Sequence, residues 1–273
     1  MSSLNHTLTD SATMLRRNLR HMLRYPSMTV LLAGMPVVFL LLFVYVFGGA
    51  IGNGLGPGPA GGGAGGAGGG RGEYIVYVMP GILLMTVAAV AQGTAVSVAM
   101  DMTEGIISRF RTMSISRASV LTGHVVGSLV QTVIAMVIVV AVALVIGFRS
   151  DATPVEWLAA LGILGMIAFA VIWLSVALGL VSKTVEGASN LPMPLTLLPF
   201  LGSGFVPTDS MPTGLRWFAE YQPFTPVMET LRGLLTGTPI GNNAALTAAW
   251  STAIALLAYL WARKLYNRDP AAR

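Results

Sequence analysis

Residues 74–100 read YIVYVMPGILLMTVAAVAQGTAVSVAM, a run that contains no charged side chain. A helix needs about 20 predominantly apolar residues to cross the hydrocarbon core of a bilayer, so this run is long enough to span a membrane. Five further uncharged stretches share this character: 28–47, 118–148, 157–182, 187–208 and 233–262. The sequence therefore predicts an all-α integral membrane protein with six transmembrane helices within residues 28–262.

The composition favours the same class. Hydrophobic residues make up 54% of the chain and charged residues only 10%, which is not the composition of a soluble protein. The net charge is +5, but the basic residues flank the apolar stretches, so membrane orientation and anionic lipid explain them better than nucleic acid does. The chain has no cysteine, which excludes disulfides, thiolate metal sites and a cysteine nucleophile.

The basic residues are distributed unequally between the connections of the six stretches. One set of connections carries twelve of them: Arg16, Arg17, Arg20, Arg24, Arg109, Arg111, Arg117, Lys183, Arg263, Lys264, Arg268 and Arg273. The other set carries only four: Arg71, Arg149, Arg216 and Arg232. By the positive-inside rule both termini are expected in the cytoplasm, with 263–273 as the second cytoplasmic tail. Arginine outnumbers lysine 14 to 2, which is associated with GC-rich bacterial genomes, so we expect a multi-pass protein of the bacterial inner membrane.

Residues 10–25 have the pattern of an amphipathic helix. Apolar side chains recur at helical spacing beside a basic line at i, i+4 and i+8: Leu15, Leu19, Met22 and Leu23, with Arg16, Arg20 and Arg24. Pro26 ends the segment. Within the tail 1–27 this helix is expected to lie in the plane of the membrane interface, the alternative being a plain tail whose charges set orientation. No cleavable signal is expected, because the first apolar run begins only at Met28 and is too long for a signal core.

The connection after the first stretch, residues 48–73, is rich in glycine and is predicted to be a flexible outer loop with no core of its own. It contains a formal G-x-G-x-x-G pattern at 56–61. No strand precedes this pattern and no helix starts at it, so it does not indicate a dinucleotide site.

Small and polar residues interrupt the second and third stretches. Ala89, Gly93 and Ser97 lie four residues apart, which would let another helix approach closely. Gln92 and Gln131 are polar groups at membrane depth and must find partners. They are interpreted either as interhelical hydrogen-bonding residues or as residues that line a substrate path.

His124 lies near the cytoplasmic end of the third stretch and has no acidic residue within that stretch. We therefore expect it to be a packing or interfacial residue rather than a proton relay. The absence of acids within the predicted spans also argues against an ion-coupled secondary transporter.

The fifth stretch contains Pro192, Pro194 and Pro199. Proline removes a backbone donor and kinks a helix, so we expect a bent or broken helix at this position. Neighbouring helices or a cavity must then satisfy the freed backbone groups. A structural kink and a functional hinge or gate both remain open.

The connection 207–243 is predicted to lie outside, yet it carries more apolar residues than a solvated loop would. Met228, Leu231, Leu234 and Leu235 recur at helical spacing and Gly237 stops the run. We interpret the segment as two short helices that dip back toward the membrane. Within it, Phe224 is an apolar candidate for the substrate path, while Glu229 and Arg232 are spaced to pair on one helical face.

No nucleotide, metal or hydrolytic site is evident. Ser182-Lys183-Thr184 resembles the end of a P-loop, but the glycine before the lysine is missing and no complete P-loop motif occurs. The three histidines are scattered over separate elements. We therefore expect no catalytic, cofactor or metal residues in this chain, which is not itself an enzyme.

Two segments resemble the ABC type-2 export permeases, and most closely the actinobacterial daunorubicin/doxorubicin-resistance permease group. They are DMTEGIISRFRTMSISRASVLTG, within and after the cytoplasmic loop 101–119, and FVPTDSMPTGLRWFAEYQPFTPVMETLRGLLTG, residues 205–237. With the six-span layout, the resemblance covers nearly the whole chain. The glycine-rich outer loop departs from the short connection usual in that family.

The resemblance implies an N-terminal amphipathic helix, six spans and outer re-entrant helices that form one half of a pore. It implies that two permease chains, identical or related, pair with two copies of a P-loop ATPase, which binds ATP and magnesium. Its loop between the second and third spans is a coupling helix that rests on the ATPase. At this contact it places Glu104, Gly105, Arg109, Phe110, Arg111, Met113 and Arg117.

The function we expect is therefore the permease subunit of an ATP-driven exporter. ATP binding in the partner would push on residues 104–117 and rearrange the second and fifth spans, with the proline-rich span as a gate. The cargo is expected to be hydrophobic or amphipathic, an antibiotic or drug first and a lipid or glycolipid second. The alternatives are a secondary transporter or channel without an ATPase, and a membrane scaffold or immunity protein that transports nothing.

Overall fold

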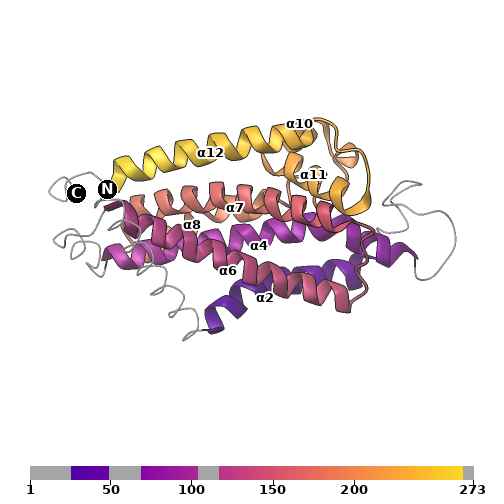
Figure 1. Ribbon diagram of the computed structural model, residues 1–273, viewed down its shortest axis with the longest axis horizontal. Helices are drawn as coiled ribbons and strands as arrows, with labels where there is room; N and C mark the ends of the chain where they lie inside the picture. The colour runs from indigo at the N-terminus through magenta and orange to yellow at the C-terminus, as the bar shows by residue number, and fades with distance from the viewer. Residues whose placement is uncertain (1–25, 49–68, 104–116, 267–273) are drawn as a thin grey trace.

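The computed structural model describes residues 26–48, 69–103 and 117–266, and every regular element within these ranges is helical. The predicted interfacial helix 10–25, most of the glycine-rich loop and residues 104–116 lie outside the described ranges. The long helices run side by side along the length of the molecule (Figure 1). This agrees with the all-α fold predicted from the sequence.

Five of the helices in the described ranges are long and apolar enough to cross a membrane. They are α2 (Pro26–Leu42, continued by the π-helical turn η1, Phe43–Phe47), α4 (Gly69–Thr103), α6 (Arg117–Val145), α7 (Pro154–Val181) and α12 (Asn243–Tyr266). They correspond to the first, second, third, fourth and sixth uncharged stretches. The fifth stretch has a different structure.

The fifth stretch does not form one continuous helix. It contains α8 (Val185–Asn190) and α9 (Met193–Leu197), followed by turns up to residue 206. Pro192 stands between the two short helices, where its ring and missing N–H interrupt the ladder of hydrogen bonds. The expectation of a bent or broken helix is therefore confirmed. We call residues 185–206 the broken segment.

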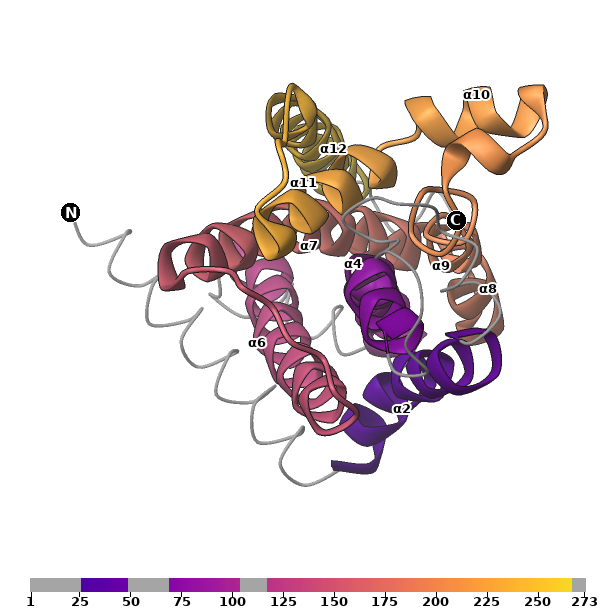
Figure 2. The ribbon, with the colours of Figure 1, turned by 90° about the vertical axis from the view of Figure 1, so that its right-hand side faces the viewer.

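Helix α4 is the interior helix of the bundle. In the most apolar part of α4, 89% of the residues are buried inside the protein, whereas the corresponding share for α12 is 17%. It packs against α2, α6, α7, α8 and α11, and Figure 2 shows it enclosed by these elements when the bundle is viewed along its length. Toward the C-terminal ends of α4 and α7, the backbone of Gly179 on α7 lies directly against the carbonyl oxygen of Ala95, because glycine leaves room for the two helices to approach.

The predicted stripe of small residues on α4 has a neighbour. The side chain of Leu32 on α2 lies against Gly93, where an added Cβ would come within 3.2 Å of Leu32 Cδ1. Helix α12 packs most extensively against α7, and there Tyr259 and Trp173 meet edge to face with their ring centroids 5.0 Å apart. These contacts hold α2 against the interior helix and α12 against α7.

Several predicted boundaries are wrong by a few residues. Helix α4 begins at Gly69, inside the predicted loop 48–73, and ends at Thr103, inside the predicted loop 101–119. Helix α6 begins at Arg117, and α12 continues through residues 263–266 of the predicted tail. The reason is physical: the loss of hydropathy marks the depth at which hydrocarbon ends, whereas the helical hydrogen-bond ladder can continue into the polar interface.

The two short helices predicted within 207–243 are present as α10 (Thr213–Tyr221) and α11 (Phe224–Thr236). Gly237 ends α11 with φ +69, the left-handed conformation that glycine adopts readily, as expected. In Figure 2 α11 is seen from its side while α12 is seen nearly end-on, so α11 lies across the bundle rather than along it. That the two helices re-enter the membrane stays a prediction.

Candidate functional site

The broken segment leaves backbone carbonyl groups that a continuous helix would have paired. At membrane depth such groups are costly unless other parts of the protein satisfy them. Three carbonyl oxygens of the broken segment, those of Ser189, Leu198 and Ser203, accept hydrogen bonds from side chains of other elements, and that of Leu198 also accepts one from the backbone N–H of Leu201. The three donors are Gln92, Gln222 and Arg232, and we call this set of contacts the carbonyl clamp.

The first contact joins α4 to α8. Gln92 Nε2 donates a 2.7 Å hydrogen bond to the carbonyl oxygen of Ser189, in the last turn of α8, where helical carbonyls lack an intrahelical partner. This is the interhelical hydrogen bond considered in one of the two interpretations of Gln92. Its role in a substrate path stays a prediction, as does that of Gln131, which is half-buried on α6.

The second contact joins the start of α11 to the turns that follow α9. Gln222 Nε2 donates to the carbonyl oxygen of Leu198 at 3.0 Å, and Thr225 Oγ1 lies 3.3 Å from the same nitrogen. The backbone of Gly202 lies against both side chains, so that an added Cβ would collide with Gln222 Nε2. Sequence reasoning missed Gln222. The only local sign of its role is that this polar amide side chain lies between the end of α10 and Pro223.

The third contact is made by Arg232 of α11. Its Nη1 donates a 2.6 Å bond to Glu229 Oε1, which confirms the pair predicted from their spacing, and its Nη2 donates a 2.6 Å bond to the carbonyl oxygen of Ser203. The guanidinium carbon lies 4.0 Å from the centroid of the Tyr77 ring on α4, within the range of a cation–π interaction. The Arg232 side chain is only 12% exposed, so these contacts form in a largely desolvated place.

Two glycines bring the broken segment directly onto α4 beside this arginine. An added Cβ on Gly81 would lie 3.1 Å from Gly204 Cα, which is backbone and cannot turn aside. Gly204 also lies against the sulfur of Met228 from α11. Helix α4, the broken segment and α11 therefore meet at one junction, and Arg232 contacts all three. Phe224, another predicted path residue, is buried in the core.

The three predicted gate prolines occupy different places in this arrangement. Pro192 and Pro199 are buried, whereas Pro194 is exposed in the first turn of α9. The carbonyl oxygen of Pro199 lies next to Gly204. The prolines thus create the break, while side chains from α4 and α11 hold the resulting geometry.

His124 has an acidic partner that lies outside its own stretch. His124 Nε2 on α6 lies 3.1 Å from Asp101 Oδ2 in the last turn of α4, and both residues are buried. The acid comes from the neighbouring helix, so the composition of the third stretch alone did not reveal it, and the buried position agrees with the expected packing role. Further along the same helices, Thr94 Oγ1 donates a 2.7 Å bond to Ser128 Oγ, also between α4 and α6. These contacts join the two helices that flank residues 104–116.

The described part of the structure does not show how the residues predicted to contact an ATPase are arranged. Arg117 opens α6, and the other six lie outside the described ranges: Glu104, Gly105, Arg109, Phe110, Arg111 and Met113. Among the residues that the structure describes, no group of three or more His, Asp or Glu side chains could hold a metal ion.

Comparison with known proteins gives one family and several relatives. The profile of the family described as ABC-2 type transporter matches residues 10–236. The chain is 28% identical over 216 residues to a daunorubicin resistance ABC transporter permease protein of Streptomyces coeruleorubidus, covering 78% of this chain and 70% of that relative. It is 25% identical over 186 residues to a "probable doxorubicin resistance ABC transporter permease protein" of Mycobacterium tuberculosis, covering 64% of this chain and 66% of that relative.

Proposed function

The chain belongs to the ABC-2 type transporter family, and from this premise we propose that it is the membrane permease of an exporter driven by a separate ATPase. The observation that carries the proposal is the course of α4. This single helix ends at residue 103, next to the predicted ATPase contact, and its other half carries Tyr77 and Gly81 against the broken segment and α11. No proline lies between Gly81 and residue 103, so a displacement at the end of α4 is expected to reach Gly81, while Pro80 lies just beyond it.

The proposed energy source is a P-loop ATPase, with ATP and magnesium bound by that partner. This chain has no P-loop motif of its own, so its transport cycle needs nucleotide hydrolysis elsewhere. In the proposed cycle, closure of an ATPase dimer pushes residues 104–117, and the His124–Asp101 contact makes the facing ends of α4 and α6 move together. The displacement of α4 then reaches the carbonyl clamp.

The moving part at the outer end is proposed to be the broken segment. A continuous helix resists bending, whereas two short helices joined at Pro192 can change their relative angle with few hydrogen bonds lost. Figure 1 places the end of α7 and the helices α10 and α11 at opposite ends of the bundle, so the broken segment between them runs along its length. We infer that it is the fifth of six crossings.

The translocation path is proposed to lie between two permease chains. The interior helix α4 is enclosed by helices of its own chain, which supports placing the path at an outer face of the bundle shared with a second copy or a related chain. Gln131 and the clamp residues Gln92 and Arg232 remain the proposed path and gate residues, whereas Phe224 is buried in the core and does not reach an outer face.

The proposed location is the bacterial inner membrane, with both termini cytoplasmic. The start of α2 and the end of α12 lie toward the same end of the bundle in Figure 1. Arg263 and Lys264 occupy the last turn of α12 at that end, which supports its cytoplasmic assignment.

The proposed cargo is an amphipathic drug of the anthracycline kind, because relatives are named for resistance to daunorubicin and doxorubicin. The described part of the bundle has no metal cluster that would select an ion, and its buried Arg232 is paired with Glu229. A lipid or glycolipid is the second candidate, since the same apolar surfaces would suit its acyl chains.

The test is purification from the native host in mild detergent, followed by reconstitution into liposomes. We expect a P-loop ATPase to co-purify, and daunorubicin to move across the membrane only when ATP is supplied on the ATPase side. The control is the same complex with the P-loop lysine of the ATPase replaced. A preparation free of ATPase, or flux that persists without ATP, would instead indicate a secondary transporter; hydrolysis without any flux would indicate a different cargo such as lipid.

A further inference from the structure

Helix α10 turns its largest aromatic side chains away from the protein. Trp217 and Tyr221 are 66% and 65% exposed, while Ala219, on the opposite side of the helix, is fully buried. The two aromatic residues lie four positions apart, so they share one helical face, and their ring centroids are 5.4 Å apart. Phe218 extends this face and is also exposed. We call Trp217, Phe218 and Tyr221 the aromatic face.

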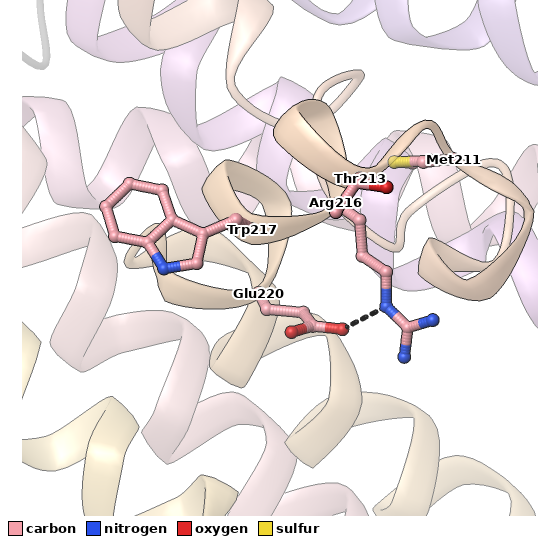
Figure 3. Close-up of a pocket in the computed structure, with 5 residues that line it drawn as sticks. All are labelled: Met211, Thr213, Arg216, Trp217 and Glu220. Atoms are coloured by element: carbon pink, nitrogen blue, oxygen red, sulfur yellow. Dashed lines mark hydrogen bonds and ion pairs between the residues drawn. The ribbon is translucent and has the colours of Figure 1, made fainter.

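A set of ion pairs borders the aromatic face on one side. Arg216 pairs with Glu220 on the same helix and with Asp209 before it, both at 2.7 Å. The hydrogen bond to Glu220 and the charge of Asp209 raise the pKa of Arg216, so this guanidinium stays charged. Figure 3 shows the Trp217 indole pointing to one side of the helix and the Arg216–Glu220 pair lying on the other. The helix is thus aromatic on one side and charged on the adjoining side.

The position of α10 decides what can cover the aromatic face. Its main contacts are with α11 and the short turn η2 (Thr208–Ser210), and in Figure 2 it projects sideways beyond the bundle. A bilayer surrounds the bundle laterally. A helix that projects sideways at one end of the membrane-spanning helices therefore lies over lipid, at the level where headgroups begin.

The surface that leads to α10 is also apolar. The broken segment exposes Met193, Leu197 and Leu201 along its length, and Val206 just before η2. In the proposed arrangement, apolar side chains exposed on a membrane-spanning segment face acyl chains wherever the second chain does not cover them. The aromatic face thus continues a lipid-facing surface at its outer end, where tryptophan and tyrosine concentrate because they combine an apolar ring with a polar group.

We propose that the aromatic face of α10 binds phospholipid of the outer leaflet, with the rings of Trp217 and Tyr221 at the level of the glycerol and headgroup layer. The Arg216 ion pairs then face water at the rim. This contact goes beyond the export function. It anchors α10 at a fixed depth, and α10 continues through Gln222 into α11, so the outer side of the carbonyl clamp is held to the membrane surface.

The experiment uses the native absence of cysteine. Single variants W217C and Y221C are each labelled with bimane, and the full complex is placed in vesicles of phosphatidylcholine. The acyl chains carry bromine either near the headgroup or near the bilayer centre, since bromine quenches bimane on contact. R216C, which faces away from both aromatic residues on the charged side of α10, is the matched control, and L257C on the exposed apolar face of α12 shows that the deep quencher works.

We expect both aromatic-face labels to lose more emission with shallow bromine than with deep bromine, and the R216C label to lose little with either. The Y221C variant retains Trp217, so the result does not depend on one substitution. Unquenched labels at both positions would overturn the proposal. So would stronger quenching by deep bromine, or spontaneous disulfide-linked dimers of the unlabelled W217C variant, which would show that a second chain covers this face.

Discussion

The guanidinium of Arg232 on α11 donates a 2.6 Å hydrogen bond to the carbonyl oxygen of Ser203, 29 positions earlier in the chain. The same side chain pairs with Glu229 and lies over the ring of Tyr77 on α4. A single residue thus connects the outer helix, the broken segment and the interior helix. This junction gives the proposed exporter a place where motion of α4 reaches its outer end.

Replacing Arg232 with alanine should destabilise the protein and weaken export. The variant leaves the carbonyl of Ser203 without this donor and Glu229 without its cation. Because Glu229 is about one-third exposed, solvent screens its charge, and the expected loss of about 2–3 kcal/mol is smaller than the roughly 3–5 kcal/mol of a fully buried pair. Thermal unfolding in detergent and ATP-driven drug flux in liposomes measure the two effects.

Two variants sharpen the interpretation of Arg232. Arg216→Ala removes an exposed arginine of α10 and should leave the unfolding temperature almost unchanged. Arg232→Lys keeps the charge but loses the planar contact with Tyr77 and one of the two donors, so it should export less than wild type while folding normally. If the R232A variant exports drug at the wild-type rate, Arg232 has no role in the transport mechanism.

Replacing Gly81 with alanine should separate the broken segment from α4. The added methyl group would lie 3.1 Å from Gly204 Cα, tighter than nine in ten real Cβ contacts, so the backbone of the segment must give by a few tenths of an ångström. Overpacking of this kind costs roughly 1–3 kcal/mol. The matched control is Gly162→Ala on α7, where nothing lies within 4 Å and alanine improves helix propensity. Equal unfolding temperatures for the two variants would show that the glycine contact is absent in the membrane.

Replacing Gln92 with leucine tests whether this residue acts through the protein or through the cargo. Loss of the bond to the Ser189 carbonyl should lower stability by about 1 kcal/mol, as for other hydrogen bonds between membrane helices. If the bond is its main role, the apparent KM for drug stays constant while the maximal flux falls. A raised KM at unchanged stability would place Gln92 in the path instead. Ser97→Ala, on the exposed side of α4, serves as the control.

His124 and Asp101 should behave as one unit in coupling. In a double-mutant cycle, D101A and H124A each remove one partner of the 3.1 Å contact, so the double variant should be no worse than either single one. We expect each variant to keep basal ATP hydrolysis by the complex and to lose its stimulation by drug. Strictly additive effects on stimulation would show that the two residues act independently.

Sequence reasoning found the elements of this fold because each is determined locally. The uncharged runs predict the long helices, and the spacing of Glu229 and Arg232 predicts their pair. The break in the fifth stretch follows from Pro192, since proline cannot continue the hydrogen-bond ladder. The exact ends of the helices did not follow from the sequence, because hydropathy reports depth in the membrane rather than the last hydrogen bond.

The contacts of the site could not be predicted in the same way. Gln222 and Leu198 are 24 positions apart, and Asp101 and His124 are 23 apart on different helices. Nothing in the spacing of either pair determines which helices become neighbours. When a side chain donates to a backbone carbonyl, the acceptor can belong to any residue type. The sequence therefore gives no sign of which residue accepts the bond. Packing around α4 decides these partners, so they emerge only from the three-dimensional arrangement.

The most direct test of the central claim follows the broken segment while the partner binds ATP. Cysteines replacing Leu201, exposed on that segment, and Ser97, exposed on α4, carry spin labels, and pulsed electron resonance measures their separation in the reconstituted complex. We expect ATP binding to change this distance, and the change to disappear when Arg111→Ala is introduced in the predicted ATPase contact. An unchanged distance in a complex that exports drug normally would contradict the proposed role of the broken segment as the gate.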